Sequence, residues 1–264
     1  MRAIMAIAAT TVGEAIRRKV LLIILLIGVL FLAVAPGLNT LSTQSETTVL
    51  KGMVLGIVQL TSAVIAIVLT VYMIPNEIER RTIYTIVSKP VQRWQFLIGK
   101  YLGAVGALGI MMLLMSLVME ITFFLQFQSG FKAEDALDLL RAPAMFFVQM
   151  SLLAAVAICF STFVTPLVNF FLSGGLYLIG SLFAPFFDSL NQNSSTPMFA
   201  KLTARFVGVV LPNFSIYNVQ NPIINPGQTI QNPTTYYMQV TGYGVLYIGL
   251  LLVLGIVILD RREV

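Results

Sequence analysis

The chain has 264 residues, of which 58% are hydrophobic and 10% charged, and its mean hydropathy is +0.90. Soluble domains carry about 25% charged residues, so this composition excludes an ordinary soluble enzyme and indicates a protein whose main solvent is lipid. Histidine is absent, which excludes catalysis that depends on an imidazole base or ligand. In a membrane protein, the position of the basic residues behind the net charge of +5 indicates which side of the membrane each loop faces. We expect no nucleic-acid partner.

The N-terminal segment, residues 1–19, predicts a helix that lies along the membrane surface. Its apolar residues recur at helical spacing, whereas Arg2, Glu14 and Arg17 fall on other faces. The apolar run that follows has basic residues before it, as a signal peptide does. Because Pro36 is a poor residue after a cleavage site, we expect this run to be retained as a membrane anchor.

Apolar runs predict six membrane-spanning helices, since a bilayer core needs about 20 apolar residues per helix. They cover roughly residues 20–38, 53–74, 101–124, 144–164, 167–184 and 240–259. The expected fold class is an all-α integral membrane protein with six transmembrane helices, forming a single domain over residues 1–264. With both termini in the cytoplasm, 11 of the 16 Lys and Arg residues lie inside and 5 outside, as the positive-inside rule requires. We therefore expect a multi-pass protein of a bacterial-type inner (plasma) membrane.

The cytoplasmic loop between the second and third spans, residues 76–100, carries a dense group of charges. Glu77 and Arg81 are four residues apart, in the acid-first order that favours pairing on one helical face. Pro90 breaks this helix and starts a second one, because the residue before a proline is pushed out of the helical region. Trp94 suits the headgroup layer, and Lys100 is expected at the water-facing end of the third span. The residues alone leave two interpretations open: a docking element for a cytoplasmic partner, or a positive anchor for the spans.

The stretch EIERRTIYTIVSKPVQRWQFLIGKYLG, which starts at Glu77, closely resembles the loop between the second and third spans of type 2 ABC (ATP-binding cassette) transporter permeases. It is similar in particular to the branch that includes the permease of nitrous-oxide reductase copper-site maturation. The features that carry the resemblance are Glu77 and Glu79, Thr82 and Ile83, Ser88 to Val91, Arg93, and Gly99 to Tyr101. An amphipathic start, six spans, a long outer segment before the last span and a short charged tail agree with the same family.

The resemblance implies that this loop is a coupling helix, which sits in a groove of an ATP-binding subunit and transmits its closure to the spans. The positions it implies for contact with that subunit are Glu77, Glu79, Arg80, Arg81, Thr82, Lys89, Pro90 and Arg93. Residues 1–19 would be the family's connecting helix. The chain would form half of an exporter with a second permease copy, as a homodimer or heterodimer.

The chain lacks the phosphate-binding motif G-x-x-x-x-G-K-[ST], because its Gly99-Lys100 pair has neither the upstream glycine nor a following Ser or Thr. We therefore expect no cofactor and no enzyme activity in this chain, with ATP and Mg²⁺ bound by the partner subunit. The alternatives are an ion-coupled secondary transporter and a non-catalytic membrane scaffold. A secondary transporter usually places ionisable or discontinuous elements near the midplane, which this sequence does not clearly show, and a scaffold gives no reason for the loop pattern.

Glu120 is the one carboxylate inside a predicted span. It lies about 28 Å along the third span at 1.5 Å per residue, near the outer headgroups. Two roles stay open for it: a place on the substrate path, or a hydrated or paired interfacial carboxylate. Gly99 and Gly103, four residues apart, let the third span approach a neighbour closely, either another span or the second copy.

Four methionines line the third span at helical spacing: Met111, Met112, Met115 and Met119. Thioethers suit Cu(I), but methionine also fills helix interfaces, and without histidine or a second cysteine we expect no metal site.

The long segment 185–239 is rich in Asn, Ser, Thr and Pro and is expected on the outer side. Leu202 and Phe206 belong to an amphipathic piece that is expected to lie on the membrane surface. Gating and simple packing both remain open for this segment. Nothing in it identifies a substrate.

Overall fold

A computed structural model describes residues 2–39, 46–79, 92–126, 133–183, 197–199, 202–203, 208, 211–218 and 232–261. Within these residues the regular structure is entirely helical. In chain order the elements are α1 (Arg2–Arg17), α2 (Lys19–Asn39), α3 (Glu46–Val71), α4 (Met73–Glu79), α6 (Arg93–Gln126), α7 (Ala133–Ser161), α8 (Pro166–Leu178), the π-helix η1 (Ile179–Phe183), the 3-10 helix η2 (Ser215–Tyr217) and α12 (Pro233–Arg261).

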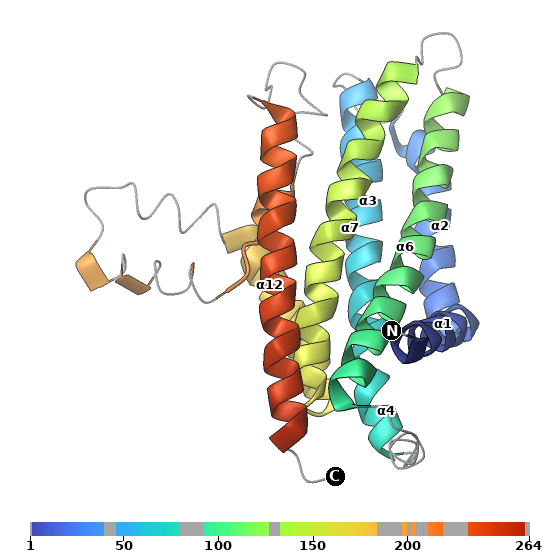
Figure 1. Cartoon of the computed structure of the whole chain (residues 1–264). Coiled ribbons are helices and arrows are strands. Elements are labelled where there is room, and N and C mark those ends of the chain that lie inside the picture. The colour runs from blue at the N-terminus through green and yellow to red at the C-terminus, as the bar shows by residue number, and fades with distance from the viewer. Residues whose placement is uncertain are drawn as a thin grey trace.

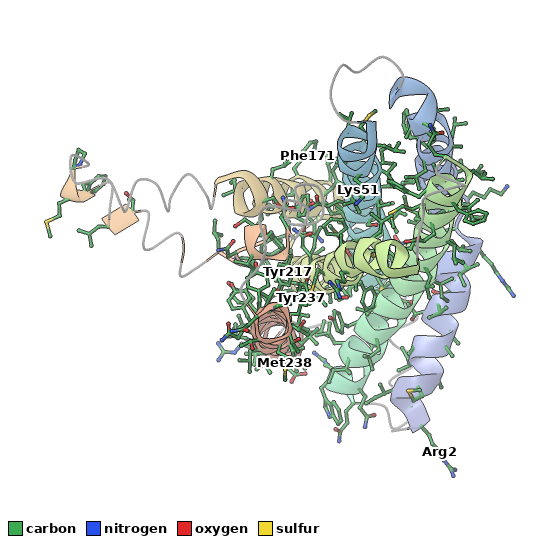
Figure 2. The ribbon with its side chains drawn as sticks, turned by 90° about the horizontal axis from the view of Figure 1, so that it is seen from above. Arg2, Lys51, Phe171, Tyr217, Tyr237 and Met238 are labelled. Atoms are coloured by element: carbon green, nitrogen blue, oxygen red, sulfur yellow. The ribbon has the colours of Figure 1, made fainter. Side chains whose placement is uncertain are left out.

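The long helices form one bundle, and α1 lies across it (Figure 1). Seen from above, α1 shows its whole length beside α6, whereas α12 is viewed nearly along its axis (Figure 2). We call the end of the bundle at which α1 lies the α1 end, and the opposite end the far end. The chain start and the end of α12 both lie toward the α1 end (Figure 1).

Five of the described helices are long and apolar enough to cross a membrane, and they coincide with five of the six predicted spans. They are Lys19–Gly37, Val49–Glu77, Arg93–Gln126, Leu139–Ser161 and Pro233–Arg261. A bilayer core does not accept unpaired backbone groups, so helices of this length are what the long apolar runs dictate. The all-α membrane architecture follows directly from the composition.

The predicted fifth span, 167–184, is shorter than expected as an α-helix. Its α-helical part, α8, has 13 residues and rises about 20 Å, which is less than the roughly 30 Å of a bilayer core. It begins at Pro166 after an N-cap at Thr165, where the sequence predicts a tight turn. At Leu178 the α-helix gives way to the π-helix η1.

The boundaries of the second and third spans differ from those predicted. The chain turns at Tyr72, three residues before Pro75, and Pro75 is tolerated in the first turn of α4. The expected second loop helix and the third span form one continuous helix, α6, of 34 residues. The predicted outer segment also ends earlier, because α12 begins at Pro233.

The core of the bundle lies along α7, which packs against α3, α6, α8 and α12. A continuous run of α7, from Leu152 to Ile158, is buried on all sides. A helix that is apolar all round and buried is typical of the centre of a bundle. α2, α6 and α12 instead leave rows of large apolar side chains exposed, as a protein in lipid does.

Candidate functional site

Lys100 occupies a buried position where three helices meet at the α1 end. The lysine, on α6, is 5% exposed. Its Nζ atom lies 2.6 Å from Oε1 of Glu77 on α4 and 3.7 Å from Oε2 of Glu14 on α1. A buried ammonium is stable only when it is paired, so these carboxylates determine where the lysine can sit. We call Glu14, Glu77 and Lys100 the Lys100 ion cluster.

The burial of Lys100 corrects the expectation that it lies at the water-facing end of the third span. The helix continues through this position instead of starting here, and α1 covers it from the side. Phe96 lies one turn before Lys100, with its ring centroid 5.8 Å from Nζ. The lysine is therefore a connecting residue between elements and not a surface anchor.

Two glycines of α6 allow α1 to approach closely enough to form the cluster. A Cβ atom built on Gly99 would lie 2.9 Å from Ile7, and one on Gly103 would lie 2.5 Å from Thr11 and 2.8 Å from the Ala8 carbonyl oxygen. The helix backbones therefore touch. The predicted close contact of these glycines exists, but the neighbour is α1, which is neither a span nor a second copy.

Three of the eight predicted partner-binding residues fall in the described part of the chain. Glu77 belongs to the Lys100 ion cluster, and Glu79 is the last residue of α4. Arg93 begins α6 and donates from Nη1 to the carbonyl oxygen of Leu259 at 2.8 Å. This guanidinium caps the carboxyl end of α12, where a cation also suits the helix dipole.

The other five, Arg80, Arg81, Thr82, Lys89 and Pro90, lie outside the described residues, and so does the predicted Glu77–Arg81 pair. Glu14 and Lys100 were not predicted as a pair. Their signal in the sequence is weak: Glu14 is the only acidic residue before Glu46, and Lys100 stands inside a stripe of small residues.

A chain of buried hydrogen bonds crosses the middle of the bundle. Gln149 on α7 is fully buried; its Nε2 donates to the Phe214 carbonyl oxygen at 2.9 Å, and its Oε1 accepts from Gln59 of α3 at 3.2 Å. Phe214 belongs to the irregular segment 211–218. Irregular backbone persists at membrane depth only where its polar groups are paired; Gln149 pairs the Phe214 carbonyl oxygen here, and Gln59 holds Gln149 in place.

The same segment is wedged between α7, α8 and α12. Phe214 and Tyr217 are fully buried, and the Tyr217 hydroxyl donates to the Val240 carbonyl oxygen at 3.3 Å. A Cβ on Gly180 in η1 would lie 2.6 Å from the Phe214 ring. Part of the predicted outer segment therefore packs inside the bundle. The amphipathic piece around Phe206 lies mostly outside the described residues.

The family model described as ABC-2 family transporter protein matches residues 5–264. The chain belongs to the ABC-2 transporter family. No curated protein matches the sequence at a significant level. Membership makes the chain the membrane-spanning permease subunit of an ABC transporter, with an ATP-binding subunit as its partner.

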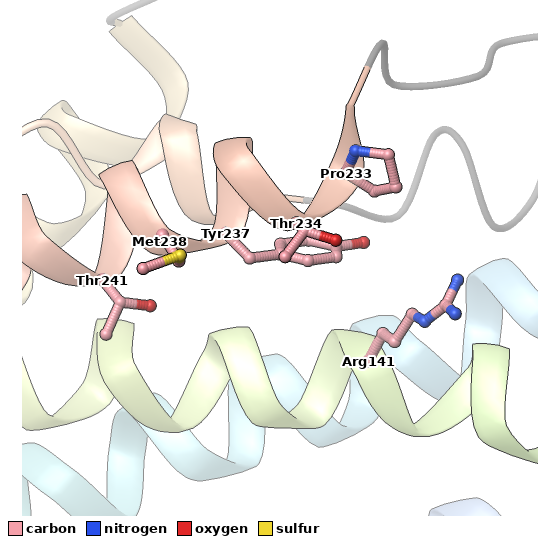
Figure 3. A pocket seen from close by; sticks show the side chains of 6 residues that line it. All are labelled: Arg141, Pro233, Thr234, Tyr237, Met238 and Thr241. Carbon is pink, nitrogen blue, oxygen red and sulfur yellow. The ribbon is translucent and has the colours of Figure 1, made fainter.

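The permease has an open cavity of about 510 Å³ between the far-end halves of α7 and α12 (Figure 3). Arg141 of α7 faces Thr234 and Tyr237 of α12, with Met238 and Thr241 deeper along the same helix (Figure 3). One cation, hydroxyl groups and an aromatic ring suit an amphiphilic ligand in general and identify none in particular.

Glu120 and the methionines of the permease lie on α6. Glu120 is six residues, or about 9 Å, before the described end of the helix, and its buried Oε1 has no hydrogen-bond partner among the described residues. The four methionines are buried, and Met115 packs against Gly28 of α2 together with Thr61 of α3. That packing is the gap-filling role of methionine.

Proposed function

We propose that this permease forms half of an ABC exporter and that the loop at residues 76–100 docks in the ATP-binding subunit. The α1 end is then cytoplasmic, both termini lie inside, and α1 rests on the inner leaflet as the connecting helix. The distribution of basic residues and the resemblance of the loop support this orientation.

The observation that carries the proposal is the Lys100 ion cluster. It joins α4, the described start of the loop, to α1 and to α6 through one buried ammonium. At the other end of the loop, Arg93 joins α6 to the carboxyl end of α12. A loop that is fixed at both ends transmits a push from a docked subunit to α1, α6 and α12. A loop attached at one end only would move without them.

The described contacts divide the predicted loop residues into two roles. Glu77 and Arg93 are positioning residues, because their charged groups bind within this chain. The docking surface then consists of Glu79, Arg80, Arg81, Thr82, Lys89 and Pro90. ATP and Mg²⁺ bind the partner subunit, and this chain supplies no cofactor site.

We further propose that the transporter contains two permease copies in a bacterial-type plasma membrane. The run 167–184, which includes α8 and η1, is proposed as the sixth crossing. Glu120 is proposed to lie on the substrate path, because its unpartnered carboxylate oxygen is a place where a polar substrate gains a hydrogen bond. Similarity of the loop to the copper-site maturation branch makes that branch our first choice, with the substrate left unassigned.

The test is to co-express the permease with a candidate ATP-binding subunit and purify the complex by a tag on the permease. Arg81→Glu with Lys89→Glu should abolish co-purification, while Arg2→Glu with Lys51→Glu reverses two charges away from the loop and should leave it intact. Glu77→Gln should keep the ATPase bound but lower its stimulation by the permease. Unchanged binding after reversal of the loop charges would refute the docking proposal.

A further inference from the structure

A cavity of about 640 Å³ opens at the α1 end, between the α1–α2 junction and the α3–α4 junction. One half of its lining is polar and highly charged. This half consists of Glu14, Arg17, Arg18, Lys19, Asn76 and Glu77. The other half is apolar and includes Val20, Leu21 and Val68.

The charged half carries an excess of positive charge. Arg17, Arg18 and Lys19 are consecutive, and none of them has an ion pair in the described part of the chain. The two carboxylates of the lining, Glu14 and Glu77, are already bound by Lys100. With Lys100 counted, four cations face two carboxylates, which leaves two positive charges without a counterion in the described structure.

The two halves meet where the apolar run of α2 begins, which is the level expected for the boundary between headgroups and acyl chains. Arg17 is the last residue of α1, Lys19 is the first of α2, and the span itself begins with Val20 and Leu21. Tyr72, 44% exposed, also lines the cavity, and tyrosine favours this interface. A soluble phosphate compound has no apolar part to pack against the apolar half of the lining. A phospholipid can place its phosphate against the charged half and its acyl chains against the apolar half.

We propose that this cavity binds an anionic phospholipid of the leaflet at the α1 end, with its phosphate held by Arg17, Arg18 and Lys19 and its acyl chains along Val20 and Val68. Clustered basic residues beside a span attract anionic headgroups at close range. A bound lipid would fill the space between the α1–α2 junction and α4, and so support the Lys100 ion cluster from the membrane side. The proposal concerns the lipid contact of this chain and needs no ATP-binding subunit.

The experiment measures lipid retention on the purified full-length chain by native mass spectrometry. Phosphatidylglycerol and phosphatidylcholine of equal chain length are added in parallel, and glycerol 3-phosphate serves as the soluble phosphate. Arg17→Gln with Arg18→Gln should lower phosphatidylglycerol retention about 25-fold, since each cation near an anionic group contributes a factor of about five. The matched control, Arg2→Gln with Arg261→Gln, removes two cations at the same end and should leave retention unchanged.

A second variant guards against misfolding of the first, because loss of basic residues beside a span can disturb its insertion. Asn76→Asp adds a negative charge to the opposite wall without changing any Lys or Arg, and it should also lower phosphatidylglycerol retention. Equal retention of the two lipids, or an equal loss in the control variant, would overturn the proposal. Displacement of phosphatidylglycerol by glycerol 3-phosphate would assign the site to a soluble phosphate compound and overturn the lipid.

Discussion

Neutralising Glu77 tests whether Lys100 is held as the structure indicates. The pair is nearly dry: the lysine side chain is 7% exposed and that of Glu77 18%, with 2.6 Å between the charged atoms. In Glu77→Gln the ammonium stays buried and keeps only the more distant Glu14, at 3.7 Å and 57% exposed. The variant therefore isolates the energetic cost of a buried and poorly compensated charge.

The expected magnitudes follow from these exposures. Removing one partner of a buried ion pair costs about 3–5 kcal/mol, and we expect about 3 kcal/mol for Glu77→Gln because Glu14 remains. Glu14→Gln should cost less than about 1 kcal/mol, as exposed pairs do. The double change Glu77→Gln with Lys100→Met removes both charges at similar volume, and it should lie within about 1 kcal/mol of the wild type.

The assay is unfolding of the purified chain in mixed micelles by titration with sodium dodecyl sulfate, followed by far-ultraviolet circular dichroism. Together with the single variant Lys100→Met, the wild type, Glu77→Gln and the double variant form a double-mutant cycle for Glu77 and Lys100, and the coupling energy should be at least about 2 kcal/mol. If Glu14→Gln and Glu77→Gln lose equal stability, or if the double variant loses the sum of the two single losses, Lys100 is hydrated in the folded protein and the reasoning fails.

Three further changes test the contacts around the site. Gly103→Ala should destabilise the chain by about 1–3 kcal/mol, because its Cβ would meet Thr11. The control Gly249→Ala places its Cβ in open space and should be neutral or stabilising. The same dodecyl sulfate titration distinguishes the two variants. Gln149→Leu leaves the buried Phe214 carbonyl oxygen only the longer bond from the Tyr217 N–H, at 3.4 Å, and should cost about 0.5–1.5 kcal/mol; no loss would mean that water replaces the lost donor. Arg93→Gln should cost only about 0.5–1 kcal/mol but speed amide hydrogen exchange in the last turn of α12, and exchange unchanged there would contradict the capping role.

Long apolar runs made five of the crossing helices predictable, because a bilayer leaves the backbone no alternative to a helix over some 20 residues. The same rule overestimated the α-helical length of the run at 167–184. Its helix changes type after Leu178, and a distant segment packs against Gly180 in the π-helix. Periodicity reports the neighbours along the chain and cannot report a contact with Phe214, which is more than thirty residues further on.

The candidate site was predictable as a region but not as a set of contacts. The loop residues and the resemblance indicated where a partner is proposed to dock, because the charged residues gather between the second and third spans. Lys100, however, pairs with Glu77, which lies 23 residues earlier in the chain, and with Glu14 on α1. Its partners are decided by the approach of α1 to α6 at Gly99 and Gly103, and only the folded arrangement reveals that approach.

The bond from Arg93 to Leu259 constrains how the protein is made. The two residues are 166 positions apart. At roughly 5–20 residues per second, the arginine is synthesised on the order of ten seconds before its acceptor. This contact therefore forms only after the last turn of α12 has been synthesised and has left the ribosome. Until then the loop is fixed only at its α4 end, through the Lys100 ion cluster.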